Sequence, residues 1–184
     1  SVADCGGTVT VKATTKVTTK VSIIGGAGYG AAEILRHLLV RDDVQLLRVS
    51  SKDHIGKSLG DVHKTLAGYT TLKLEDLPPK EAAAGADVVF LGMPHKITAK
   101  VAMELFELPC KILDLSGDFR LKSLVDYERD YAPGHPCPER LGTFVYGLPE
   151  LFREPIKVAR YVASPGCFAT CIAVGLLPLA GAGL

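Results

Sequence analysis

Short apolar runs alternate along most of the chain with stretches whose apolar residues recur at helical spacing. Runs of this length, rich in Val, Ile and Leu, are typical of strands buried on both faces of a parallel sheet. Alternating strands and helices therefore predict an α/β fold with a doubly wound parallel sheet and right-handed crossovers. The strands are expected at residues 20–24, 44–49, 71–74, 86–91, 111–114 and 158–163, and the clearest helices at 31–39 and 97–107.

A glycine-rich turn separates the first predicted strand from the first predicted helix. It spans Gly25–Ala31 with the spacing G-x-x-G-x-x-A, a variant of the dinucleotide-binding fingerprint. In such a turn the backbone can approach a pyrophosphate at Gly25 and Gly28, while the small Ala31 lets helix and strand pack closely. The alternative is a tight strand-to-helix connection without a ligand.

The second strand is followed by Ser50-Ser51-Lys52. An NAD site usually places Asp or Glu here for the ribose 2′-hydroxyl, whereas hydroxyls and a cation suit a 2′-phosphate. This pattern favours NADP(H) over NAD(H), with Ser51 and Lys52 as the contacts. Asp53 argues mildly against it, and an ordinary solvated loop is the alternative.

The strand at 86–91 ends in Gly92-Met93-Pro94-His95. Because ligands of doubly wound sheets collect at the carboxyl ends of strands, Gly92 and Pro94 are expected to border the nicotinamide half of the cofactor. His95 could act as a base, although a histidine at a helix start more often caps or packs.

A polar cluster, Asp114–Arg120, follows the strand at 111–114. Arg120 could bind an anionic substrate, because a guanidinium presents a bidentate fork to carboxylate or phosphate. The alternative is an Asp–Arg pair that only holds the loop. Beyond it, residues 122–145 carry charges, Pro and Gly with few apolar repeats, which predicts a surface excursion.

The last predicted strand leads through a Ser-Pro-Gly turn to Cys167 and an apolar helix. Unpaired N–H groups and the positive end of the helix dipole at that position favour a thiolate, which is a nucleophile. The alternative is a small buried hydrophobe.

The charge balance and the cysteine content limit the classes of binding partner and the compartment that are expected. The chain has 21 basic and 20 acidic residues, so nothing indicates nucleic acid or a membrane surface, and small polar partners are expected. Five cysteines, an odd number without a C-x-x-C pair, indicate neither a disulfide framework nor a metal site. Reduced thiols in a cytoplasmic compartment fit this content.

Four motifs together resemble the N-acetyl-gamma-glutamyl-phosphate reductase family of arginine biosynthesis. They are Gly25-Gly-Ala-Gly-Tyr29 with Gly30 beside it, Asp114-Leu-Ser-Gly-Asp-Phe-Arg120, Tyr146-Gly-Leu-Pro-Glu150 and Ser164-Pro-Gly-Cys167. The resemblance implies a Rossmann-type domain that binds NADP(H), with Tyr29 and Gly30 among its cofactor contacts. It also implies an enzyme with Cys167 as catalytic nucleophile and a pocket for a small anionic acyl phosphate formed by Arg120, Tyr146 and Ser164.

The chain departs from the family at three places. The family commonly has Asn for Ser164, Tyr-Pro for Phe168-Ala169 and Thr-Gly for Gly30-Ala31. The family also carries its general-base histidine well downstream of the cysteine, so residues 1–184 are expected to be an amino-terminal half. We therefore divide the chain into a tail (1–19), an NADP-binding domain (20–163) and the start of a catalytic and substrate domain (164–184), and expect a homo-oligomer.

Two other functions stay open at this point. A related reductase acting on an aminoadipyl or aspartyl phosphate would use the same cysteine chemistry. A non-catalytic module that binds NADP(H), with an inert Cys167, would share only the glycine turn.

Overall fold

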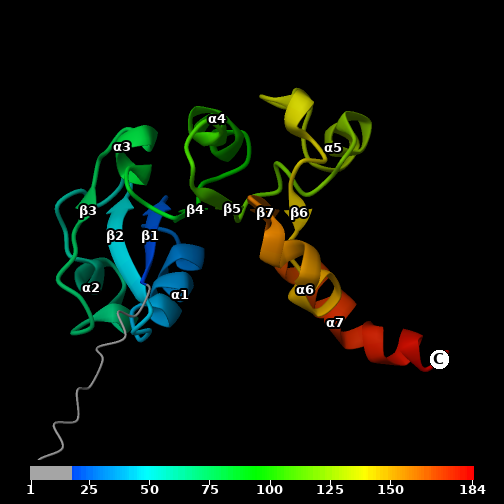
Figure 1. Cartoon of the computed structure of the whole chain (residues 1–184), viewed down its shortest axis with the longest axis horizontal. Coiled ribbons are helices and arrows are strands. Elements are labelled where there is room, and N and C mark those ends of the chain that lie inside the picture. Colours follow the sequence, from blue (N-terminus) through cyan, green and yellow to red (C-terminus); the bar gives the residue numbers. More distant parts are fainter. Residues whose placement is uncertain (1–17) are drawn as a thin grey trace, which may run out of the picture.

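The computed structural model describes residues 18–184, which form a seven-stranded parallel sheet with the strand order β3-β2-β1-β4-β5-β7-β6 (Figure 1). The strands are β1 (Thr19–Ile24), β2 (Val44–Ser50), β3 (Leu74–Glu75), β4 (Val88–Leu91), β5 (Lys111–Asp114), β6 (Val145–Tyr146) and β7 (Tyr161–Ala163). The direction of winding reverses between β1 and β4, so the predicted doubly wound sheet is confirmed. The expected tail lies outside the described residues except for Thr18 and Thr19.

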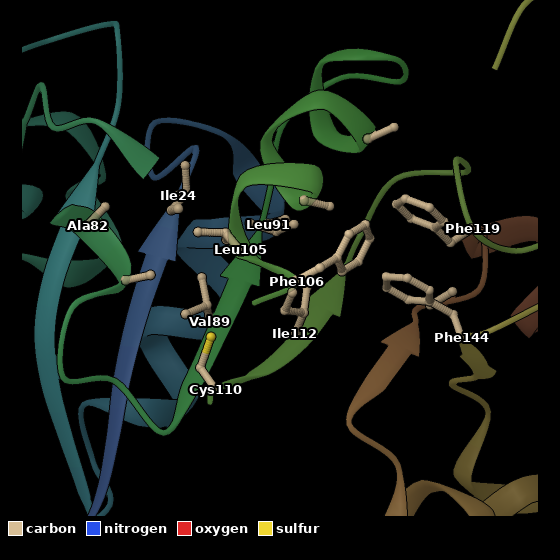
Figure 2. Close-up of a cluster of buried hydrophobic side chains, with 14 of the residues drawn as sticks. Ile24, Ala82, Val89, Leu91, Leu105, Phe106, Cys110, Ile112, Phe119 and Phe144 are labelled. Atoms are coloured by element: carbon tan, nitrogen blue, oxygen red, sulfur yellow. The ribbon is translucent and has the colours of Figure 1, made fainter. Parts of the chain in front are cut away.

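Helices cover both faces of the sheet because successive strand residues point to opposite sides. Ile23 of β1 packs in the core with α1 and α2, and Ile24 packs with α3 and α4. Figure 2 shows the second core, in which Leu91 lies beside Leu105 of α4 and Ile112 lies beside Phe106, the residue that follows α4. The helices are α1 (Tyr29–Leu38), α2 (Leu59–Val62), α3 (Pro79–Ala83), α4 (Ile97–Leu105), α5 (Leu124–Asp130), α6 (Pro149–Val158) and α7 (Cys167–Gly181), with 3₁₀ turns at Lys64–Leu66 and Pro138–Arg140.

One expectation for the second half is wrong, and two elements there were not predicted. Residues 122–145 are more than a surface excursion, because Tyr127, Cys137 and Phe144 are buried there and Phe144 stacks on Phe119 at 4.1 Å between ring centroids. The spacing of these three buried residues along the sequence matches neither the helix nor the strand period, so the pattern did not indicate their burial. The sequence also failed to indicate β6 and α6, since α6 contains Pro155 and is kinked at Phe152.

Helix α7 is apolar along its length, yet none of its residues is buried. Figure 1 shows it running away from the sheet toward the end of the chain. A helix that is apolar on all sides is normally buried. Within residues 18–184, α7 therefore lacks an apolar cover, and none of the helices there is long and apolar enough to cross a bilayer.

Candidate functional site

The parallel register brings the carboxyl ends of five strands to one edge of the sheet. Ile24 of β1 pairs with Ser50 of β2 and with Leu91 of β4. Leu91 pairs with Asp114 of β5, which pairs with Ala163 of β7. At about 4.8 Å between neighbouring strands, the ends of β1 and β7 lie about 14 Å apart. The glycine turn after β1 and the Cys167 turn after β7 therefore share this edge.

A cavity of about 1120 Å³ opens at the point where the strand order reverses. Its volume is that of a large ligand site. Every residue that the sequence assigns to the cofactor lines this cavity. They are Gly25, Gly28, Tyr29 and Gly30 from the first turn, Ser51 and Lys52 after β2, and Gly92 and Pro94 after β4.

The glycines of the first turn serve different purposes. Gly25 has φ +92°, and a Cβ there would lie 2.7 Å from the carbonyl carbon of Gly92, so this glycine lets the β1 and β4 turns approach. A Cβ on Gly26 would lie 2.1 Å from Cγ1 of Val49, a packing constraint that the sequence analysis missed. At Gly28 a Cβ would meet nothing closer than 3.8 Å, so its exposed backbone is left for a ligand.

The start of α1 fits the pyrophosphate of a dinucleotide. Gly28 is the N-cap of α1, no side chain caps the helix, and its first turn holds no acidic residue. The first N–H groups of a helix lack intrahelical partners, and together with the helix dipole they attract an anion. Ala31 is buried between helix and sheet, as the fingerprint predicts. These features and the adjoining cavity suit a dinucleotide.

The two predicted 2′-phosphate contacts have partners within the protein. The Lys52 ammonium donates to Asp76 Oδ1 at 2.6 Å, and the Ser51 hydroxyl accepts the N–H of Asp53 at 3.0 Å. Asp76 also lines the cavity but was not singled out from the sequence. The rule that selected Ser51 and Lys52 would have found it, because Asp76 directly follows β3.

Cys167 is the first residue of α7 and is exposed. Gly166 caps the helix without a side-chain hydrogen bond, so the N–H groups of the first turn are open. The alternative of a buried hydrophobe is therefore wrong for Cys167. That description instead fits Cys110 and Cys137, where burial raises the pKa of both thiols, to about 12 for Cys137. Cys171 is exposed but lies one turn inside α7.

Arg120 lies against the turn that carries Cys167. Its Nε donates to the Ser164 carbonyl oxygen at 2.7 Å and Nη2 donates to the Leu115 carbonyl oxygen at 2.9 Å. Nη1 donates weakly to the Tyr131 hydroxyl at 3.4 Å, and a Cβ on Gly166 would lie 3.1 Å from Nη1. A guanidinium has five N–H groups, so about two stay available for an anion.

The alternative of a loop-holding Asp–Arg pair is not found, since no salt bridge joins Arg120 to a carboxylate within residues 18–184. The two aspartates of the cluster instead bind N–H groups. Asp114 accepts the Ser116 N–H at 2.7 Å and its hydroxyl at 3.0 Å. Asp118 accepts the Lys96 and Ala99 N–H groups at 2.8 and 2.9 Å, which caps α4.

The two remaining substrate candidates flank the same turn. Tyr146 ends β6, is half-buried and pairs with Ala163 in the register. Ser164 is half-buried, and its N–H donates to the Asp114 carbonyl oxygen at 2.7 Å. Arg120, Tyr146, Ser164 and Cys167 do not line the large cavity. They gather at the neighbouring strand ends of the same edge.

His95 has a fixed ring orientation. Its Nδ1 accepts the Gly117 N–H at 2.8 Å, so the ring proton of a neutral His95 sits on Nε2. The 3.9 Å separation of Nδ1 from Asp118 Oδ1 is therefore not an ion pair in that state. A base at Nδ1 would first have to give up the Gly117 bond. This geometry favours the packing role over the base role.

The fold and the cavity together are those of a Rossmann-type dinucleotide-binding domain. Residues 20–159 match the family model for the semialdehyde dehydrogenase NAD-binding domain. The chain therefore belongs to the semialdehyde dehydrogenase family.

Two curated relatives carry different substrate names. The chain is 45% identical over 164 residues to a Thermomicrobium roseum protein provisionally named LysW-L-2-aminoadipate 6-phosphate reductase, covering 89% of this chain and 46% of that protein. It is 42% identical over 159 residues to N-acetyl-gamma-glutamyl-phosphate reductase of Acinetobacter baylyi, covering 86% and 45%. The resemblance drawn from the four motifs is confirmed, and the chain spans about half the length of these relatives.

Solved structures share the fold at low sequence identity. Aspartate semialdehyde dehydrogenase II of Vibrio cholerae superposes with a TM-score of 0.63 at 19% identity, covering 88% of this chain and 46% of that one. The Candida albicans aspartate semialdehyde dehydrogenase solved with NADP gives 0.59 at 12% identity, with 88% and 46% covered.

Proposed function

We propose that this chain binds NADP(H) and carries the nucleophile of an acyl-phosphate reductase that converts N-acetyl-gamma-glutamyl phosphate to the semialdehyde, as in arginine biosynthesis. The observation that carries the proposal is the shared sheet edge. It joins a dinucleotide-sized cavity at β1 and β4 to an exposed cysteine at the start of α7. Residues 20–163 form the cofactor part in this proposal, and residues 164–184 begin the catalytic part.

Cys167 starts the reaction. Its thiolate attacks the acyl carbonyl carbon, the carbon–oxygen bond to phosphate breaks, and phosphate leaves with the electron pair, so that a thioester forms. The open N–H groups at the start of α7 stabilise the oxyanion that develops on the carbonyl oxygen. Arg120 would bind the anionic phosphate with the N–H groups that make no bond within the protein.

Bound NADPH supplies the hydride that reduces the thioester. The residues that line the cavity would hold NADPH at the same edge of the sheet as Cys167. Hydride addition leaves a thiohemiacetal anion, whose oxygen re-forms the carbonyl group while the carbon–sulfur bond breaks and its electron pair restores the thiolate of Cys167. Ser51 and Lys52 select the 2′-phosphate in this proposal.

Reduction of an aminoadipyl phosphate is the second candidate. The 45% identity to the Thermomicrobium roseum protein favours it, and the cysteine chemistry would be unchanged. The groups that separate the two substrates must recognise the side chain beyond the acyl phosphate. A homo-oligomer and a cytoplasmic location remain predictions from the sequence.

Thiol labelling tests the proposal. The chain is treated with limiting iodoacetamide over a range of pH, with and without NADPH, and the modified cysteine is identified by peptide mass. We expect Cys167 to react first and NADPH to change its rate. The exposed Cys171 on the same helix is the internal control, and Cys171→Ser should leave the Cys167 rate unchanged. If Cys167 and Cys171 are alkylated at equal rates and NADPH changes neither rate, the catalytic assignment is overturned.

A further inference from the structure

The proposed function assigns the Lys52 ammonium to the ribose 2′-phosphate, but this ammonium already forms an ion pair with the Asp76 carboxylate. Lys52 Nζ and Asp76 Oδ1 lie 2.6 Å apart, and both residues line the cavity. The Lys52 side chain is 84% exposed and that of Asp76 is 43% exposed, so a ligand can reach the pair from solvent. The pair thus lies inside the candidate cofactor site.

The backbone holds the two side chains together. Ser50 pairs with Glu75 at the ends of β2 and β3, and the Ser51 N–H donates to the Glu75 carbonyl oxygen at 2.9 Å. Lys52 directly follows Ser51, and Asp76 directly follows Glu75. The proximity of the two residues therefore follows from strand pairing.

We propose that Asp76 is a specificity-determining residue that acts through Lys52 and lowers the preference of the site for NADPH over NADH. A 2′-phosphate needs the Lys52 ammonium, which Asp76 already binds, so the two anions compete for one cation. A ribose 2′-hydroxyl carries no charge and leaves the Lys52–Asp76 pair intact. This inference rests on the proposed binding of NADP(H).

Calorimetry with NADPH and NADH tests the inference without any turnover. For Asp76→Asn we expect about 5- to 10-fold tighter NADPH binding and NADH binding within about twofold of the unaltered chain, the size expected for one partly exposed charge pair. For Lys52→Met we expect about 10-fold weaker NADPH binding. The gain from Asp76→Asn should fall below about twofold in the Lys52→Met background, because the competition for the ammonium is then gone.

Asp87→Asn is the matched charge control. Asp87 accepts the Lys20 N–H at 2.7 Å at the opposite edge of the sheet, so this variant changes net charge equally but away from the cavity. It should leave the NADPH to NADH ratio unchanged. Higher salt should shrink the Asp76→Asn gain by screening.

The outcomes separate this inference from the proposed function. If both cofactors bind but Asp76→Asn leaves their ratio unchanged, the role of Asp76 fails and the cofactor site stands. An equal gain with and without Lys52 would also overturn the inference, because Asp76 would then act by direct repulsion. If the unaltered chain binds neither cofactor, the proposed function fails as well.

Discussion

Arg120 Nε donates a hydrogen bond of 2.7 Å to the carbonyl oxygen of Ser164. The bond ties the loop after β5 to the turn that precedes Cys167, and the Arg120 bond to Leu115 secures the other side of the guanidinium. A planar guanidinium can hold two carbonyls at once and still present N–H groups to a ligand. Arg120 thus positions the turn that precedes Cys167.

Replacing Arg120 by Lys should loosen that turn. An ammonium cannot reproduce the fork that holds Ser164 and Leu115, so we expect the alkylation rate of Cys167 to fall toward that of Cys171, by about 10-fold. The dissociation constant for NADPH should stay within about twofold, because Arg120 does not line the cavity. Labelling kinetics and calorimetry on the same preparation measure both.

Arg160→Lys provides the control for the Arg120 variant. Arg160 also donates to two carbonyl oxygens, those of Phe106 and Leu108, but it precedes β7 and lies at the other edge of the sheet. It should leave the Cys167 rate unchanged. Equal loss of Cys167 reactivity in both variants would mean that general destabilisation, and not the Ser164 contact, is responsible.

Gly25→Ala should destabilise the fold and weaken cofactor binding together. The φ of +92° is costly for alanine, and the new Cβ would lie 2.7 Å from the Gly92 backbone. We expect a loss of about 1–3 kcal/mol in the free energy of unfolding by urea denaturation. Gly30 lies inside α1, and a Cβ there would meet only Leu115, at 3.6 Å. Gly30→Ala should therefore leave the free energy of unfolding unchanged or raise it. A stable Gly25→Ala chain would contradict the close approach of the two turns.

Asp114 should make stability depend on pH. Burial, opposed by the Ser116 hydrogen bonds, raises the pKa of Asp114 from 3.8 to about 6. The folded state then holds the proton more tightly than the unfolded chain, so the stabilising contribution is complete below pH 3.8 and is lost as the pH rises through about 6.

Asp114→Asn should remove that trend. Relative to the variant, the unaltered chain should lose up to about 3 kcal/mol of unfolding free energy between about pH 4 and pH 7. Urea denaturation at several pH values in this window measures the difference. The exposed Asp130, whose pKa is lowered by Arg129, supplies a control, because Asp130→Asn should show no loss of this sign. A pH-independent difference for Asp114→Asn would refute the assignment.

The uncovered apolar surface of α7 should bind a hydrophobic dye. Ile172, Leu176 and Leu179 are 60%, 56% and 48% exposed, and their spacing places them along one face. Changing all three to Lys should lower anilinonaphthalene sulfonate fluorescence by about half or more, with unchanged cofactor binding. Val40→Lys with Tyr69→Lys removes comparably exposed apolar groups elsewhere and should have little effect. Equal dye fluorescence in the two variants would contradict the prediction that α7 is the main surface that binds the dye.

The fold class and the strand ends were accessible from the sequence because they depend on local patterns. A parallel strand that is covered on both faces is apolar throughout, and the predicted strand at 86–91 contains β4, with the sequence Val-Val-Phe-Leu, for this reason. The chemistry of parallel sheets collects at the carboxyl ends of strands, so Gly92, Lys52 and Cys167 could be selected as candidates from position alone.

Tertiary structure decided the contacts between segments distant in the sequence. Lys52 meets Asp76 only because β2 pairs with β3, and Arg120 holds Ser164 only because β5 pairs with β7. Buried aromatic residues such as Tyr127 follow no period, since each fills a particular space in the core. The sequence by itself thus determined the fold and which residues reach the functional edge, while strand pairing decided their partners, because hydrogen bonds and ion pairs form across space and leave no spacing along the chain.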